Sequence, residues 1–117
     1  MAERTQSILA EVAAERENQD ATWGEQNHSP EVWLMILGEE VGEANRSALQ
    51  AWVAGRHDGK RSGWRRLLHE YRAELIQVAA VSIAMIESLD RNELAEPKPE
   101  KPRRRLSGGD PMSHGGG

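Results

Sequence analysis

Apolar side chains recur every three or four residues through most of residues 1–95, and this spacing constrains the fold more than any other feature of the sequence. It matches the turn of an α-helix, and the strict alternation of a half-buried β-strand is not visible. Helices are therefore expected at residues 3–20, 30–55 and 64–89. Ser29 as cap, Pro30 at the first helical position and Glu31 in the first turn mark the start of the second helix.

The third predicted helix is apolar on most sides beyond Leu75, and such a helix is normally buried by neighbours on several faces. We therefore expect an all-α fold, a bundle of about three helices per chain whose four-helix-type core is completed by dimerisation. Trp33, Trp52 and Trp64 are expected in the core or in a subunit interface. The stretch from Gly55 to Gly63, with three glycines and several charged side chains, is expected to form a surface loop.

The last 22 residues differ in composition from the rest of the chain. They hold four of the five prolines, five of the eleven glycines and only two apolar side chains. Such a segment buries too little surface to offset its ordering entropy. The sequence therefore predicts a helical domain at residues 1–95 and a disordered Pro/Gly/Arg-rich tail at 96–117.

Charge and composition exclude several classes of function. The tail carries five basic and three acidic groups, which leaves 10 Lys and Arg against 16 Asp and Glu for residues 1–95. This acidic balance argues against direct binding of a nucleic-acid polymer. The absence of cysteine excludes disulfides and thiolate metal sites.

No segment of the sequence resembles a membrane span or a signal peptide. The longest strongly apolar run, residues 78–86, is well below the roughly 18 to 20 residues that cross a bilayer. The first residues have neither a basic nor an apolar region of the kind that signal peptides carry. We expect a cytoplasmic protein without a membrane partner.

Polar side chains interrupt the apolar pattern of the second and third helices. Three carboxylates fall within one turn of the second helix, the first two of them bracketed by Gly38 and Gly42, and a polar stripe runs along the third helix at i, i+4 and i+7. Facing stripes of this kind repel unless a hard cation with oxygen ligands, Mg²⁺ or Mn²⁺, lies between them. The candidate ligands are Glu39, Glu40, Glu43, Glu70, Glu74 and Gln77.

Two other interpretations of these carboxylates were weighed. Acidic side chains on helices are commonly solvated, so a structural bundle with exposed Glu residues is one alternative. A di-iron carboxylate site needs Glu-x-x-His on two helices, and the sequence offers this spacing only at Glu25 and His28, in an expected loop. The di-iron interpretation is therefore rejected.

The segment Leu37-Gly38-Glu39-Glu40-Val41-Gly42-Glu43, followed by Glu74-Leu75-Ile76-Gln77, resembles the MazG-like all-α nucleoside triphosphate pyrophosphohydrolases. Their pattern is Glu-Glu-x-x-Glu on one helix and Glu-x-x-Asp on the next. Residues 23–28 and 74–81 are similar to the small, phage-type branch in particular. The resemblance covers residues 20–90.

The resemblance implies Mg²⁺-dependent hydrolysis of (d)NTP to (d)NMP and pyrophosphate by an assembly of at least two chains, a homodimer or a tetramer. It places Glu39, Glu40, Glu43 and Glu74 at the metal-binding positions. Gln77 stands where the family has Asp, so Glu70 supplies the missing charge, the site holds fewer metal ions, or activity is weakened. Glu40 and Glu43 are the candidates for taking a proton from the attacking water.

Residues for substrate binding are expected in two segments outside the acidic stripes. The polar segment before the second helix offers an aromatic platform and hydrogen-bonding groups for a base, in Trp23, Gln26, Asn27 and His28. Basic residues in and after the Gly-rich segment are candidates for the outer phosphates, namely Lys60, Arg61, Arg65 and Arg66. The alternative function is a catalytically eroded MazG-like module that binds nucleotide or a protein partner, because Gln77 replaces a carboxylate.

Overall fold

The computed structural model describes residues 2–57 and 61–96, and it is all-helical within these ranges. Three long helices, α1 (Glu3–Trp23), α2 (Pro30–His57) and α3 (Arg61–Leu89), are followed by a short π-helix, η1 (Asp90–Leu94). No strand occurs in the described residues, which confirms the all-α prediction. The predicted tail, apart from Glu96, lies outside the described residues, as does Lys60.

Helix α1 runs to Trp23, three residues beyond the predicted end. It ends at Gly24, whose φ of 73° lies in the left-handed region that glycine adopts without steric cost. The Gly24 N–H donates to the Asp20 carbonyl at 2.8 Å, which satisfies one of the last carbonyls of the helix. Gly24 therefore ends the helix, and residues 21–23 before it remain helical.

The start of α2 follows the predicted capping pattern. The Ser29 hydroxyl accepts a hydrogen bond from the Val32 N–H at 3.4 Å, and the Ser29 carbonyl accepts one from the Trp33 N–H at 3.0 Å. These bonds satisfy two of the N–H groups that a helix start leaves without partners inside the helix.

The predicted loop from Gly55 to Gly63 is wrong at both ends, because α2 continues to His57 and α3 begins at Arg61. Gly55 lies inside α2, where a Cβ would come within 2.8 Å of the Trp64 Nε1 atom. The missing side chain lets Trp64 of α3 pack against the end of α2. Tertiary contact thus outweighs the low helix propensity of glycine at this position.

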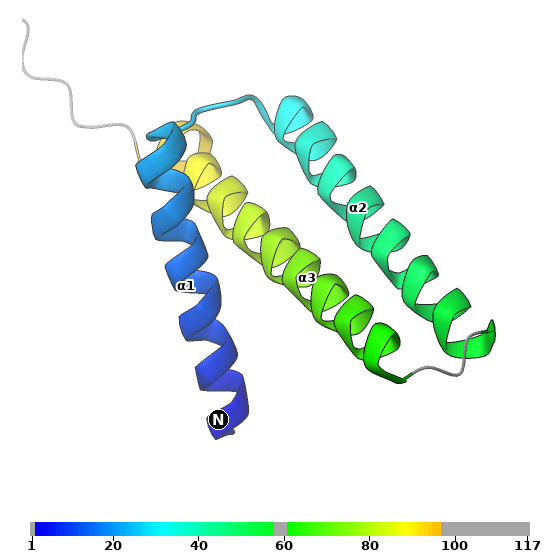
Figure 1. Cartoon of the computed structure of the whole chain (residues 1–117). Coiled ribbons are helices and arrows are strands. Elements are labelled where there is room, and N and C mark those ends of the chain that lie inside the picture. The colour runs from blue at the N-terminus through cyan, green and yellow to red at the C-terminus, as the bar shows by residue number, and fades with distance from the viewer. Residues whose placement is uncertain (1, 58–60, 97–117) are drawn as a thin grey trace, which may run out of the picture.

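Helix α3 lies between α1 and α2 and packs against both (Figure 1). The core between α2 and α3 is small and is formed by Trp33, Val81 and Ala84, with partly buried side chains around them. Trp33 is 4% exposed, which confirms its predicted place in the core, whereas Trp52 is 56% exposed. The second chain that would complete a four-helix core remains a prediction.

Ion pairs join α1 to α3. Arg72 donates to both carboxylate oxygens of Glu11, at 2.8 and 2.6 Å, and Arg16 pairs with Glu87 near the other end of the contact. Val12 is the buried residue of α1. Ion pairs therefore form much of the contact between α1 and α3.

The end of the described chain holds the connection between α1 and α2. Arg91 donates to the Gln26 carbonyl and to the Asn27 side-chain oxygen, and Asn92 donates to the same Asn27 oxygen at 2.8 Å. Asn92 also donates to the hydroxyl of the buried Ser88.

None of the helices in the described ranges has the length and apolar character needed to cross a membrane.

Candidate functional site

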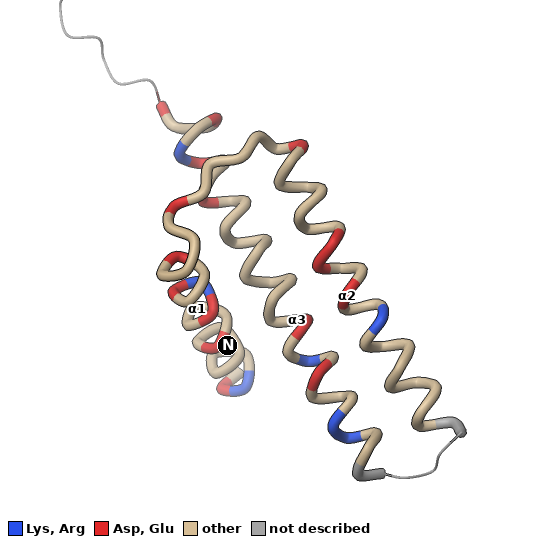
Figure 2. The backbone as a smooth tube through the Cα atoms, turned by 45° about the horizontal axis from the view of Figure 1, so that its top comes forward, with Lys and Arg blue, Asp and Glu red and all other residues tan. Residues whose placement is uncertain are grey.

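Three carboxylates from two helices meet between α2 and α3. Glu40 and Glu43 lie one turn apart on α2, and Glu74 lies on α3. Carboxylate oxygens of the three residues lie within 4.8 Å of one another. Figure 2 shows acidic segments near the middle of both helices. We refer to Glu40, Glu43 and Glu74 as the acidic triad.

Within residues 2–57 and 61–96, no ion pair compensates the charges of the acidic triad. Burial raises the pKa of Glu40 above its usual value, and the negative charges of Glu43 and Glu74 raise it further. Burial likewise raises the pKa of Glu74, with a further contribution from Glu43. The ion pairs of the described residues are made by other carboxylates, those of Glu11, Asp20, Glu25, Glu70 and Glu87. The triad therefore has an excess of negative charge that a cation would relieve.

The donor set fits a hard divalent ion. Three carboxylates on two rigid helices supply the oxygen ligands that Mg²⁺ and Mn²⁺ prefer, and Mg²⁺ usually retains waters as its other ligands. The close approach of the three carboxylates is the structural observation that supports this fit. The pKa values of Glu40 and Glu74 are raised in agreement with it, by burial and by the neighbouring Glu43. Glu40, Glu43 and Glu74 are the residues that would hold the ion.

The other three candidate ligands lie outside the triad. Glu39 is exposed, and its charge makes a smaller contribution to the raised pKa of Glu40. Glu70 is exposed and pairs with Arg66 at 3.1 Å, one turn earlier on α3. Gln77 accepts a hydrogen bond from Gln19 of α1 at 3.3 Å, so its oxygen is directed to α1.

A cavity of about 340 Å³ adjoins the triad at Glu40. It lies among all three helices, and its volume is within the range of small-molecule sites. Side chains of α1, α2, α3 and the connection between α1 and α2 line it: Glu15, Asn18, Gln19, Thr22, Trp23, Gln26, Trp33, Ile36, Glu40, Gln77, Val81 and Ala84. A molecule in this cavity would lie next to a triad-bound ion.

The segment expected to recognise a base is only partly at this cavity. Trp23, 68% exposed at the end of α1, and Gln26 line it. Asn27 is instead held by Arg91 and Asn92. The His28 ring contacts Trp33 edge-on, with ring centroids 4.9 Å apart.

Of the predicted phosphate-binding cations, the structure describes the side chains of Arg65 and Arg66, which lie on α3 before Glu74. Arg65 is exposed on α3, nine residues before Glu74 and hence about 13 Å away along the helix axis. Arg61 is the first residue of α3, and its side chain lies outside the described part of the chain, as does Lys60. Arg66 pairs with Glu70 and not with a residue of the triad.

Two residues of α1 enter the site although the sequence analysis did not single them out. Gln19 lines the cavity and bonds to Gln77, and Arg16 donates to Gln19. Both follow the buried Val12 at helical spacing, four and seven residues later. The signal that could have identified them is their position, one and two turns after an apolar residue that faces the other helices.

Comparison of the chain with protein-family models, with curated proteins and with solved structures finds no match.

Proposed function

We propose that the chain is a Mg²⁺- or Mn²⁺-dependent nucleoside triphosphate pyrophosphohydrolase that converts (d)NTP to (d)NMP and pyrophosphate. The observation that carries this proposal is the uncompensated acidic triad next to a cavity of small-molecule size. The spacing of the acidic residues in the sequence, which resembles that of the MazG-like enzymes, supports the same reaction.

The acidic triad can bind a triphosphate only through divalent metal ions. A triphosphate is repelled by Glu40, Glu43 and Glu74 unless divalent ions lie between them. A bound divalent ion supplies Lewis acidity at phosphate oxygens and lowers the pKa of its water. The carboxylates hold that ion and keep it beside the cavity.

Glu40 is our first candidate for the general base and Glu43 the second. In the reaction, a water oxygen bonds to the α-phosphorus, the bond to the α–β bridging oxygen breaks, and pyrophosphate leaves. The proton of the water passes to a carboxylate of the chain. Glu40 lies both in the triad and at the cavity wall, so its carboxylate is placed to take a proton from a water beside the cavity.

Incubation of the full chain with ribo- and deoxyribonucleoside triphosphates tests the proposal. With Mg²⁺ or Mn²⁺ we expect nucleoside monophosphate and pyrophosphate in equal amounts, measured by ion-exchange chromatography, and no product with EDTA. Release of diphosphate and phosphate would indicate a different reaction. Absence of pyrophosphate with every nucleotide and both metals would contradict the proposal.

A second candidate function is the catalytically eroded module that binds nucleotide or a protein partner. The observation that favours it is the Gln77 side chain, which bonds to Gln19 and adds no charge to the triad. In that case we expect binding of nucleotide without turnover. A robust rate of pyrophosphate release by the unmodified chain excludes it.

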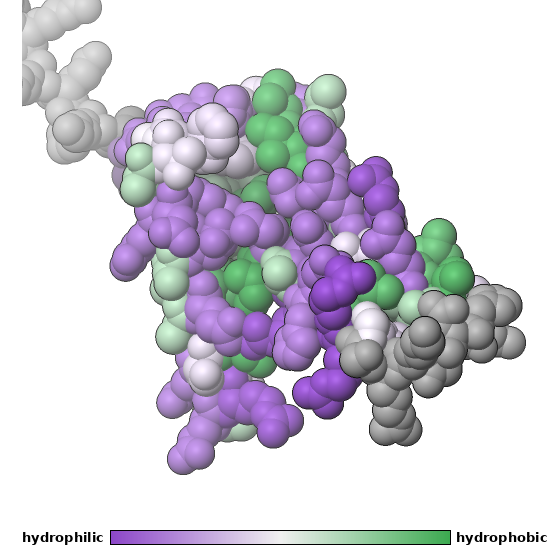
Figure 3. Space-filling model, in the orientation of Figure 1, coloured by the Kyte–Doolittle hydropathy of each residue, from purple (hydrophilic) through white to green (hydrophobic). Residues whose placement is uncertain are grey.

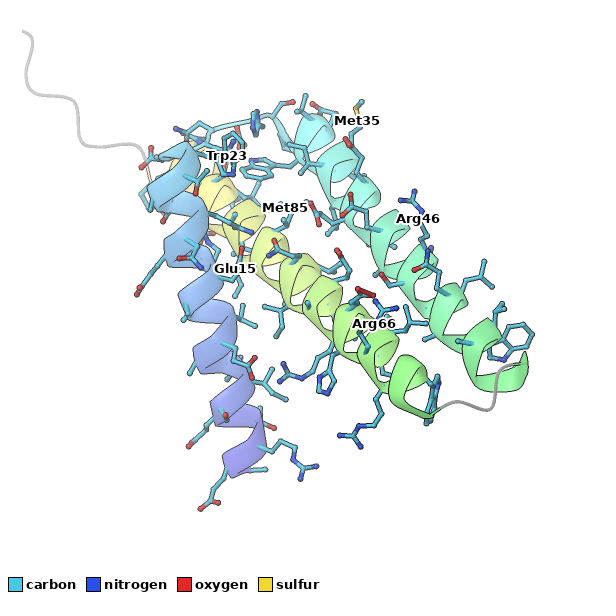
Figure 4. The ribbon with its side chains drawn as sticks, in the orientation of Figure 1. Glu15, Trp23, Met35, Arg46, Arg66 and Met85 are labelled. Atoms are coloured by element: carbon cyan, nitrogen blue, oxygen red, sulfur yellow. The ribbon has the colours of Figure 1, made fainter. Side chains whose placement is uncertain are left out.

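We further propose that the chain works as a homodimer, or as a tetramer made of two such dimers. In either assembly, α2 contacts a second copy of the chain. The side of α2 turned away from α3 carries exposed apolar and small residues in its first half at three- and four-residue spacing, and Leu49 two turns further on: Leu34, Met35, Gly38, Val41, Gly42 and Leu49. Met35 and Leu49 are 69% and 58% exposed, and Met35 points away from α3 (Figure 4). Figure 3 shows hydrophobic surface near both ends of α2. Exposed apolar side chains grouped in this way favour burial by a partner helix.

Alanine at Gly38 or Gly42 separates helix stability from self-association. A Cβ at either position meets no atom within 4 Å in the single chain, so each change favours the helix by up to about 1 kcal/mol. At a helix–helix contact the added methyl overpacks the interface by ~1–3 kcal/mol, so we expect dimerisation to weaken at least about fivefold. Analytical ultracentrifugation over a range of concentrations measures this change.

Gly63→Ala is the matched control, because it also meets open space but lies on α3. We expect Gly63→Ala to dimerise like the unmodified chain. A chain that is monomeric at all concentrations contradicts the dimer. Unchanged association of Gly42→Ala contradicts the assignment of this face.

A further inference from the structure

A directional chain of hydrogen bonds leads from Arg16 to the cavity beside the triad. Arg16 donates from Nη1 to Gln19 Oε1 at 3.2 Å, and Gln19 donates from Nε2 to Gln77 Oε1 at 3.3 Å. Arg16 is held in turn by ion pairs with Asp20 and Glu87. We call Arg16, Gln19 and Gln77 the amide relay.

Arginine fixes the direction of the whole relay. A guanidinium has only donors, so the Gln19 oxygen must face Arg16 and its NH₂ must face Gln77. The Gln77 oxygen is then used as an acceptor, which leaves the Gln77 NH₂ as a donor. Among the described residues no hydrogen bond uses this NH₂, and both glutamines line the cavity.

The Gln77 NH₂ is therefore the donor that the described cavity wall offers to an occupant. Trp33 also lines the cavity, but its Nε1–H is buried with almost no accessible surface and makes no hydrogen bond within the described part of the chain. Its ring therefore supplies apolar wall and no donor to the occupant.

We propose that this cavity binds the base of the nucleotide and that the amide relay selects bases with a carbonyl oxygen on the recognised edge. The inference rests on the proposed function, because the triad then holds the phosphates through the metal ion while the base lies in the cavity. The occupant is a planar heterocycle of the keto class, uracil or hypoxanthine, in preference to the amino class, cytosine or adenine. Trp23 at the cavity mouth offers a flat surface to such a ring.

Matched pairs of nucleoside monophosphates test this selection without any hydrolysis. UMP differs from CMP, and IMP from AMP, by a carbonyl in place of an amino group and by an N–H in place of an unprotonated nitrogen at the adjacent ring position. Isothermal titration calorimetry of the full chain with Mg²⁺ measures each dissociation constant. We expect UMP and IMP to bind about tenfold more tightly than CMP and AMP, the factor given by one hydrogen bond of about 1.4 kcal/mol.

Gln19→Glu reverses the direction of the relay. A carboxylate at position 19 still pairs with Arg16 but only accepts hydrogen bonds, so Gln77 must turn its NH₂ toward α1 and its oxygen toward the cavity. We expect the preference for UMP over CMP to vanish or invert. Gln6→Glu makes the same charge change on the exposed first turns of α1 and should keep the original preference. Gln77→Met, which has no donor, should lose the preference without inverting it.

Equal binding within both base pairs by the unmodified chain overturns the inference, and so does a preference that survives both Gln19→Glu and Gln77→Met. Melting temperatures identify a variant that fails to fold, and the other variant then decides. The two proposals fail separately. A base preference without pyrophosphate release refutes the hydrolase and supports the cavity assignment, whereas hydrolysis without any base preference refutes the cavity assignment alone.

Discussion

Replacing Glu40 by Gln is expected to lower pyrophosphate release at least about 100-fold and to abolish the rise in melting temperature caused by Mg²⁺. The amide removes one charged ligand from the triad and the first candidate for the general base. An ion that binds only the folded chain stabilises it by about 2.7 kcal/mol at a hundred times its dissociation constant. Differential scanning fluorimetry with increasing Mg²⁺ measures the loss of this effect.

Without metal the same substitution is expected to act in the opposite direction. The pKa values of Glu40 and Glu74 are raised in the folded chain, so folding disfavours their ionised forms. The resulting contribution to stability is complete below the unfolded pKa of 4.5 and is lost as the pH rises through the raised values. In EDTA at neutral pH, Glu40→Gln should therefore melt higher than the unmodified chain.

The pH dependence supplies an internal check on this argument. In EDTA the difference in melting temperature between Glu40→Gln and the unmodified chain should shrink as the pH falls toward 4.5. Glu17→Gln, exposed on α1, is the control and should show neither the difference nor the altered response to Mg²⁺. An equal rise in melting temperature with Mg²⁺ for all three proteins contradicts a metal site at the triad.

Local patterns were sufficient to predict the elements of the fold. Ser29 caps α2 as its position before Pro30 indicated, because capping depends only on neighbouring residues. The helices at both ends of the Gly55–Gly63 segment were predicted too short. Their extension at Gly55 depends on contact with Trp64, and local propensity contains no information on that contact.

The candidate site shows the same division between local and distant information. Glu40 and Glu43 share a turn of α2, so their proximity followed from helical spacing. Glu74 required the assumption that the acidic stripes face each other, which the resemblance supplied. Glu70 fits the stripe equally well by spacing, yet it pairs with Arg66 on the exposed side of α3.

Gln77 was the residue that spacing described least well. Its partner Gln19 is 58 positions away in the sequence and lies on a helix without any acidic motif. Gln77 was predicted to be a metal ligand because it lies three residues after Glu74 on the same helix. The direction of its amide depends on Arg16, two residues further along the relay, and only the packing of α1 on α3 brings the three together.

Truncating Trp33 is expected to cause the largest loss of stability in the helical domain. Its ring is 4% exposed and forms the core with Val81 and Ala84, so Trp33→Ala leaves a cavity and should cost ~3–5 kcal/mol. Urea denaturation at fixed protein concentration measures the change, because self-association would otherwise alter the apparent stability. Trp23→Ala is the control, since Trp23 is 68% exposed and should change the stability little.

Trp33→Phe separates the packing of this residue from its buried N–H. Phenylalanine keeps an aromatic ring in the core and removes the donor that lacks a partner, so we expect a smaller loss than for alanine. Mg²⁺ should still stabilise this variant, because the triad is unchanged. Equal losses of stability for Trp33→Phe and Trp33→Ala would mean that the indole is held by its polar edge, since packing alone favours phenylalanine.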